Sequence, residues 1–172
     1  MKKFLTIAFI AIFSMTSYAQ DDSKDGAKAL EEVTASLSYG FITGDSTFTG
    51  IRSGSVSVDF NFLFNVTDDL KLGAVAGASH YLYKSGRSAS DYDDVLYTIP
   101  MGATFRLYTE NDRFYIGSDA GYAIGVDTDG GFFYRPKVGM SLTDHSGITM
   151  SYSEIIDTAT LSTFSIGYEF SF

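Results

Sequence analysis

The sequence has no cysteine, which excludes disulfide bonds, thiolate metal sites and a cysteine nucleophile. Tryptophan is absent too, and there are only two prolines and two histidines. Basic residues are scarce: 12 Lys and Arg stand against 21 Asp and Glu, which gives a formal net charge of −9. A surface this acidic repels the phosphates of nucleic acid, so we expect no nucleic-acid partner.

Long apolar runs are also missing. The longest, residues 4–13, is well short of the roughly 20 residues that a membrane-spanning helix needs. Lys2 and Lys3 precede it, and a small-x-small cleavage site follows at residues 17–19. We therefore predict that residues 1–19 are a signal peptide, removed without leaving a lipid anchor because no cysteine follows. Any membrane contact of the mature chain must then be made by β-strands.

What the sequence does contain is a two-residue alternation, clearest in its last segment, residues 160–172. Small or polar residues separate five large apolar or aromatic ones: Phe164, Ile166, Tyr168, Phe170 and Phe172. A period of two places these side chains on one face of a β-strand.

The same alternation recurs along the chain and predicts eight strands, at residues 33–43, 55–66, 71–83, 95–108, 113–126, 132–142, 147–154 and 160–172. Longer polar connections follow the first and third segments, and short turns follow the second, fourth and sixth. Pro100 predicts a bulge or a local break in its strand. The facing of residues 71–83 stays open, because Val75, Tyr81 and Tyr83 conflict with the other apolar positions.

The alternation alone leaves open which face points outward. A soluble carrier of the lipocalin type would turn the apolar face inward around a ligand, whereas a membrane barrel would turn it outward. Eight strands enclose an interior that side chains just fill, and rows of Phe and Tyr would not fit there. Glycines are frequent on the polar face, where they leave room for neighbouring side chains. Both points favour the outward apolar face.

The polar face also carries charges of both signs. Buried charges must pair, since an unpaired one costs several kcal/mol of desolvation. We predict a closed network of ion pairs in the barrel lumen, formed by Asp59, Arg106, Asp119, Arg135, Lys137 and Glu169. The alternative is six solvated charges on the surface of a soluble barrel.

The terminal strand, with its alternate aromatics and final Phe172, resembles the last strand of bacterial outer-membrane β-barrels. Over nearly the whole mature chain the pattern is similar to the small barrels of the OmpA/OmpX type, the outer membrane protein β-barrel domain family. The resemblance implies an all-β fold: an eight-stranded antiparallel up-and-down transmembrane β-barrel over residues 33–172. Residues 20–32 would be a short periplasmic lead-in.

The resemblance also carries expectations about function. It implies a monomer in the outer membrane of a Gram-negative cell, in contact with outer-membrane lipid, with a structural, adhesive or surface-interaction role and no open pore. The assembly machinery of outer-membrane barrels would recognise the five apolar residues of the last strand.

Enzymatic alternatives rest on few residues. Some outer-membrane barrels modify lipid A with a Ser, a His and an acid near the outer rim, but His145 falls in a predicted periplasmic turn. Ser79 and His80 are adjacent and so face opposite sides of a strand. Residues 127–131 resemble a calcium-binding run but lack the further ligands of an EF-hand. We predict no catalytic residue, cofactor or metal site.

Overall fold

The computed structural model describes residues 32–44, 52–83, 96–126, 129–157 and 160–172. These lie within one compact unit, Glu31–Phe172. The predicted signal peptide at residues 1–19 and the lead-in up to residue 31 lie outside the described residues. In the part of the chain that is described, no helix is long and apolar enough to cross a membrane.

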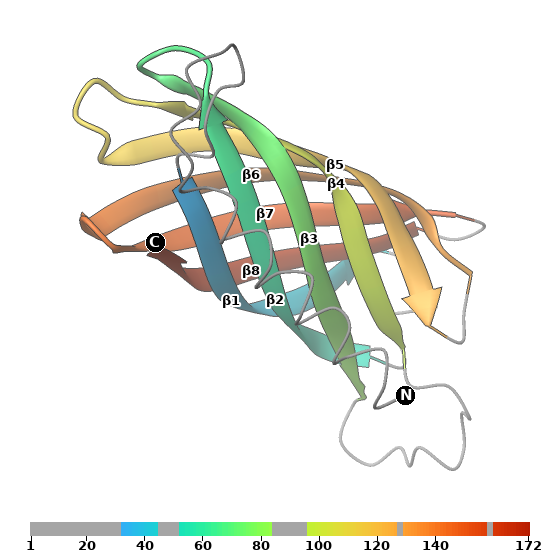
Figure 1. The fold of residues 1–172 in the computed structure, drawn as a ribbon. Coiled ribbons are helices and arrows are strands. Elements are labelled where there is room, and N and C mark those ends of the chain that lie inside the picture. Colours follow the sequence, from blue (N-terminus) through green and yellow to red (C-terminus); the bar gives the residue numbers. More distant parts are fainter. Residues whose placement is uncertain (1–31, 45–51, 84–95, 127–128, 158–159) are drawn as a thin grey trace. The chain divides into compact units, whose positions relative to one another are not determined.

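Eight antiparallel strands form one closed barrel in chain order, with β8 paired to β1 (Figure 1). This is the predicted all-β up-and-down topology. The strands are β1 Glu32–Gly44, β2 Arg52–Asn65, β3 Leu70–Tyr83, β4 Tyr97–Tyr108, β5 Phe114–Val126, β6 Gly131–Thr143, β7 Ser146–Ile156 and β8 Thr160–Ser171. Every end agrees with the predicted segments within three residues, and Glu32 belongs to β1 and not to a lead-in.

The strands are strongly staggered around the barrel. One row of paired residues starts at Val33 in β1 and returns to β1 at Thr43, ten residues further along; it passes through Phe62, Ala74, Ala103, Ala120, Tyr134, Glu154 and Ser162. A stagger of this size goes with strands tilted by about 35–45° to the barrel axis. The tilt is visible in Figure 1.

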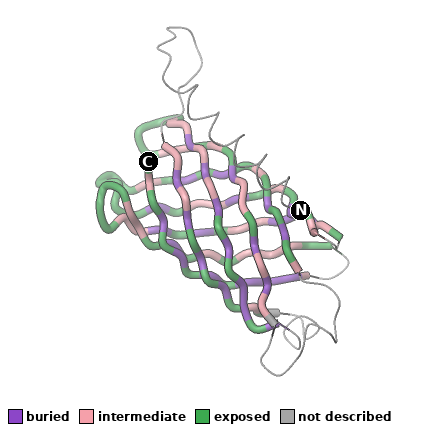
Figure 2. Tube along the Cα trace, turned by 60° about the horizontal axis from the view of Figure 1, so that its bottom comes forward, coloured by how far each residue is buried: buried purple, intermediate pink, exposed green. Residues whose placement is uncertain are grey.

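Burial alternates along the strands, as Figure 2 shows. In β8 the residues Phe164, Ile166, Tyr168 and Phe170 are exposed, and the intervening Ser165, Gly167 and Glu169 are buried. Every strand thus turns one set of side chains into the lumen and the other to the outside. The apolar set is the outer one on β8, as the glycine-rich polar face predicted.

Short turns join the strands at the end of the barrel where the chain enters β1 and leaves β8. Their polar side chains bond locally: the Leu70 amide donates to Thr67 Oγ1 over 3.1 Å, and the Arg113 amide donates to Asn111 Oδ1 over 3.2 Å. Asp112 has φ 53° in the β4–β5 turn, a conformation that Asp tolerates. We call this the short-turn end, and the opposite end the long-loop end.

Of the two outcomes expected at Pro100, a bulge or a local break, the break occurs: β4 keeps its register but loses part of its pairing. Pairing of β4 with β3 is interrupted between Ala76–Met101 and Ser79–Thr98, while pairing with β5 continues through Pro100–Ala123. Proline has no amide hydrogen to donate to β3. Pro136 in β6 has the same effect on its pairing with β7.

The open question of β3 is settled by the burial of Val75 and Tyr81; the side chain of Tyr83, the third conflicting residue, lies outside the described ones. Val75 and Tyr81 are 2% and 4% exposed and face the lumen, whereas Leu72, Ala74 and Ala78 face outward. The conflict in the sequence therefore came from apolar residues inside the barrel. Leu63 in β2, the one apolar residue on that strand's polar face, is likewise fully buried.

Candidate functional site

An Arg–Glu pair crosses the lumen between β4 and β8, which lie on different sides of the barrel. Arg106 donates to both carboxylate oxygens of Glu169, over 2.8 and 2.7 Å, and to Thr34 Oγ1 over 3.1 Å. The Arg106 guanidinium also lies 4.5 Å from the centre of the Tyr115 ring. Arg106 is fully buried. The bidentate geometry fixes both side chains and joins β4 to β8. The contacts with Thr34 and Tyr115 add β1 and β5 to the same cluster.

A second cluster is centred on Arg135 of β6. Arg135 donates to Asp59 over 2.8 and 3.1 Å and from Nε to Asp119 Oδ2 over 2.9 Å. Lys137 Nζ lies 2.6 Å from Asp119 Oδ1 and donates to Asn61 Oδ1 over 3.2 Å. Asp119 is fully buried, so its charge is stabilised by two cations and not by bulk water.

The six charged residues singled out in the sequence thus face the lumen, in two clusters. Asn61 links the clusters, because its Nδ2 donates to Thr34 Oγ1 over 3.0 Å. A further pair, Lys71 with Glu32 at 2.6 Å, lies nearer the short-turn end and is partly exposed. The sequence pattern did not single out Thr34, Asn61 or this pair, since neutral polar residues and residues at strand ends carry no distinctive signal.

Glycines on the inner face make room for the larger side chains. A Cβ added to Gly139 would run into the ring of Tyr115, whose hydroxyl lies 3.5 Å from both Thr149 Oγ1 and Glu169 Oε1. Gly102 and Gly121 are paired on β4 and β5, and a Cβ on either would meet the backbone of the other strand. The positions of these glycines therefore decide which side chains fill the lumen.

The interior is not polar throughout. Val75, Ala123 and Phe133 form a buried apolar cluster in the lumen, and Ile155 packs against it. At the other side of the ion pairs, a cavity of about 610 Å³ lies at the short-turn end, lined among others by Lys71, Tyr115 and Glu169. Sequence reasoning missed the apolar cluster, because it assigned apolar side chains to the outer face.

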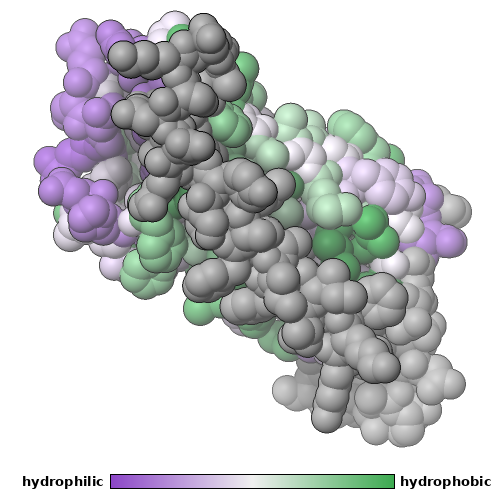
Figure 3. Space-filling model, viewed as in Figure 1, coloured by the Kyte–Doolittle hydropathy of each residue, from purple (hydrophilic) through white to green (hydrophobic). Residues whose placement is uncertain are grey.

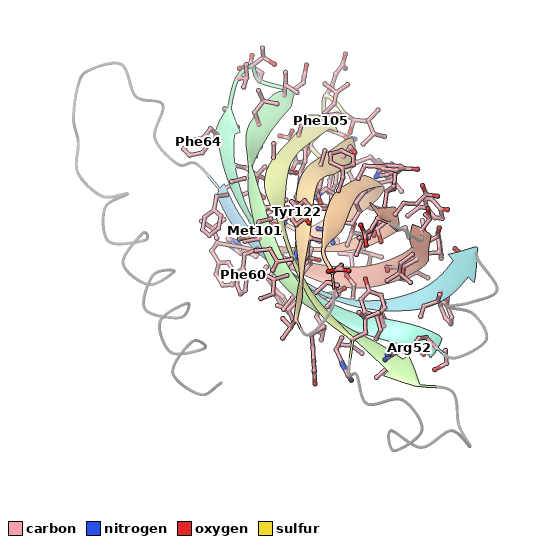
Figure 4. All side chains as sticks on the ribbon, turned by 90° about the vertical axis from the view of Figure 1, so that its right-hand side faces the viewer. Arg52, Phe60, Phe64, Met101, Phe105 and Tyr122 are labelled. Atoms are coloured by element: carbon pink, nitrogen blue, oxygen red, sulfur yellow. The ribbon has the colours of Figure 1, made fainter. Side chains whose placement is uncertain are left out.

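The outer face of the barrel is apolar where the surface of a soluble protein is polar. Among the described residues, 28 large hydrophobic side chains are exposed and only seven hydrophobic ones are buried, against 19 buried polar or charged ones. Phe60 and Phe64 project away from the barrel wall in Figure 4. On the face shown in Figure 3, hydrophobic residues occupy the middle and hydrophilic ones gather toward the ends. An apolar band of this extent has to be covered by something other than water.

The last strand is held by backbone bonds on both sides. The Phe172 amide donates to the Val33 carbonyl over 2.9 Å, and the Ser171 amide to the His145 carbonyl over 3.0 Å. The Phe172 side chain is nevertheless 80% exposed, more than any other large hydrophobic residue described. The other four predicted assembly residues, Phe164, Ile166, Tyr168 and Phe170, are exposed on the outer face of β8. Whether an assembly machinery reads them stays a prediction.

The residues weighed for enzymatic chemistry do not come together. His80 stacks on Tyr97 with ring centres 4.5 Å apart, and it faces outward while the neighbouring Ser79 is buried in the lumen. His145 is exposed in the β6–β7 turn. Within the described part of the chain no group of three or more His, Asp or Glu side chains could hold a metal ion. Residues 127–128 of the calcium-like run lie outside the described residues.

Comparison with known proteins gives structural likeness only. No family model matches the sequence, and no curated protein matches it. Among solved structures, the Yersinia pestis outer membrane protein Ail in a phospholipid nanodisc has 12% identity and a TM-score of 0.56, covering 82% of this chain and 99% of Ail.

Two further solved structures have a similar fold. The N-terminal β-barrel domain of Pseudomonas aeruginosa OprF has 11% identity and a TM-score of 0.52, covering 82% of this chain and 97% of that domain. Neisserial surface protein A has 11% identity and a TM-score of 0.51, covering 81% and 94%. This chain has the fold of the small eight-stranded β-barrels of bacterial outer membranes.

Proposed function

We propose that the protein is an integral outer-membrane β-barrel that serves a structural, adhesive or surface-interaction role and forms no open pore. The observation that carries the proposal is the reversal of its two faces. Paired charges fill the lumen, and the exposed side is a band of large apolar residues. A bilayer stabilises such a surface, because lipid chains cover it and the closed barrel satisfies its backbone hydrogen bonds internally.

The surface role is supported by the arrangement of the connections. The short turns lie at the end where both β1 begins and β8 finishes, and longer connections such as residues 84–96 join strands at the opposite end. In outer-membrane barrels the longer loops face the cell exterior. Relatives in fold include Ail, described as an attachment invasion locus protein, and a neisserial surface protein. Contact with a surface partner through the long-loop end is consistent with both.

The alternatives are a soluble ligand carrier and a lipid A-modifying enzyme. The carrier would need an apolar lumen and a polar exterior, the opposite of what the burial shows. The enzyme would need Ser, His and an acid together, whereas His80 and Ser79 face opposite sides of the β3 wall. We propose a non-enzymatic barrel that works as a monomer in contact with outer-membrane lipid and is inserted by the barrel assembly machinery.

Cell fractionation tests the proposal. The protein should sediment with outer membranes, need detergent for extraction, and migrate differently on a gel before and after heating, because the folded barrel resists the detergent. Recovery from the soluble periplasmic fraction without detergent would overturn the membrane assignment. A change in lipid A mobility upon deletion of the protein would favour the enzyme instead.

A further inference from the structure

One charged side chain stands on the outer face of the barrel wall. Of the Asp, Glu, Lys and Arg residues within the eight strands, all hold inward-facing positions except Glu154 in β7. Its neighbours on the same face of β7 are Tyr152 and Ile156, which are 36% and 43% exposed. Glu154 therefore lies inside the apolar band, with large hydrophobic side chains on both sides of it along the strand.

Three hydroxyl groups hold the Glu154 carboxylate. Tyr134 Oη donates to Oε2, Tyr152 Oη donates to Oε1 over 2.7 Å, and Ser162 Oγ donates to Oε1 over 3.4 Å. Tyr134 and Ser162 are the residues paired with Glu154 on the two neighbouring strands, β6 and β8. The wall itself thus fixes the position of the carboxylate.

These three donors are neutral, so they do not compensate the negative charge of Glu154. Five ion pairs join the described residues, and none of them includes Glu154. A charge at membrane depth is costly, and ionisable residues found there have a partner or a function. The described part of the wall supplies no cation, and the carboxylate is open to one from the lipid side.

The height of Glu154 on the barrel decides which part of a lipid it meets. It is eight residues from Ser146, at the short-turn end of β7, and two from Ile156, at the long-loop end. At about 3.3 Å per residue and a tilt of about 35–45°, eight residues rise roughly 20 Å along the barrel axis. The apolar band of such barrels is about 25 Å tall, so Glu154 lies near its long-loop boundary, at the level where headgroups begin. Below it on the same face, Met150 and Val138 are each 44% exposed and would contact acyl chains.

The oxygens around Glu154 match an ammonium group. An ammonium has three N–H donors and no acceptor, and the site offers one carboxylate and two phenol oxygens, with aromatic rings that also attract cations. A metal ion fits less well, because within the described residues no group of three His, Asp or Glu side chains is placed to hold one. We propose that Glu154, Tyr134 and Tyr152 bind the ammonium of a lipid headgroup in the leaflet at the long-loop end. This inference rests on the proposed membrane location.

Urea unfolding of the full protein in vesicles of two lipids tests the proposal. Phosphatidylethanolamine carries a primary ammonium, whereas phosphatidylcholine with the same acyl chains is also neutral overall but has no N–H group. Glu154→Gln keeps the size of the side chain and removes its charge. Tyr152→Phe removes one phenol oxygen and takes its place if Glu154→Gln fails to insert. Tyr97→Phe is the matched control, because Tyr97 is an outward tyrosine of β4, 40% exposed and remote from Glu154.

Exchanging phosphatidylcholine for phosphatidylethanolamine should lower the unfolding equilibrium constant of the wild type by about tenfold relative to that of Glu154→Gln, the effect of one hydrogen bond to a charged group. Tyr97→Phe should respond like the wild type, and Tyr152→Phe less strongly. Equal responses of the wild type and Glu154→Gln, or of the wild type and Tyr152→Phe where that variant is used, would overturn the ammonium site.

Two other results separate this site from its alternatives. A difference between wild type and Glu154→Gln that follows the protein-to-lipid ratio, and not the headgroup, would assign the cation to a second protein molecule and would also overturn the lipid site. Failure of the wild type to insert into either kind of vesicle, read from the heat-dependent gel shift, would instead overturn the proposed membrane location.

Discussion

Replacing Arg106 with methionine removes the cation of a buried ion pair while keeping much of its apolar stem. Arg106 and Glu169 have side chains only 1% and 10% exposed, and two hydrogen bonds of 2.8 and 2.7 Å join them. In Arg106→Met, Glu169 loses both bonds and keeps only weak ones, from Thr34 at 3.3 Å and Tyr115 at 3.5 Å. Stranding one partner of a buried pair costs about 3–5 kcal/mol.

The cavity at the short-turn end lowers this cost, because Glu169 lines it and water can reach the carboxylate from there. We therefore expect the free energy of unfolding to fall by about 3 kcal/mol, the low end of that range. Urea unfolding of the protein in lipid vesicles measures it, with the heat-dependent gel shift as readout. Arg113→Met, at an exposed position of the β4–β5 turn, should stay within about 0.5 kcal/mol of the wild type.

A double variant separates the charge from the packing. Adding Glu169→Gln to Arg106→Met removes the stranded charge, and Gln can still bond to Thr34 and Tyr115. Replacing both partners of a buried pair is often close to neutral, so the double variant should be more stable than Arg106→Met alone. A single variant that loses less than about 1 kcal/mol would refute the reasoning, since exposed ion pairs are worth that much. So would a double variant less stable than the single one.

Three further predictions concern the wall and the last strand. Ala120→Arg, at an exposed position in the middle of β5, should destabilise the barrel in vesicles by about 2–4 kcal/mol, and Leu142→Arg near a strand end by about 0–1 kcal/mol; equal losses would contradict the lipid band. Gly139→Val should displace the ring of the buried Tyr115 and lower the urea midpoint. The loss should exceed that of Gly147→Val, whose Cβ would lie 2.8 Å from its nearest neighbour, the Met140 carbonyl oxygen. Deleting Phe172 should reduce the amount of folded barrel in outer membranes more than Ser171→Ala does, and equal amounts would count against an assembly signal.

Much of the fold could be predicted because each strand repeats one simple rule. Side chains alternate between lumen and outside, so the polar–apolar period fixes both the strand and its facing, as in β8 and β2. The strand number followed from counting the segments. The closed barrel topology was implied by the resemblance to outer-membrane barrels, and the outward apolar face followed from the narrow interior and the inner glycines.

The rule fails where the lumen itself is apolar. Val75 and Phe133 are hydrophobic and face inward, so their hydrophobicity no longer indicates the outside of the barrel. This is why the facing of β3 stayed open and the apolar cluster was missed. It also explains why a strand with fewer large residues, such as β3, gives a weaker signal than β8.

The partners within the ion clusters could not be predicted either. Which side chains meet across the lumen depends on the ten-residue stagger, and no local pattern encodes it. Arg106 in β4 reaches Glu169 in β8, and Arg135 in β6 reaches Asp59 in β2. Charges of both signs on the polar face predicted that the charges would pair, and only the register shows which ones do.

The central claim is that the apolar face of each strand meets lipid and the polar face meets the lumen. Because the chain has no cysteine, single cysteines can be placed at Ile148, Thr149, Met150 and Ser151 of β7 and spin-labelled in lipid vesicles. Oxygen, which dissolves in lipid, should speed the spin relaxation of the labels at 148 and 150. It should not speed that of the labels at 149 and 151. The opposite alternation, or none, would contradict the account.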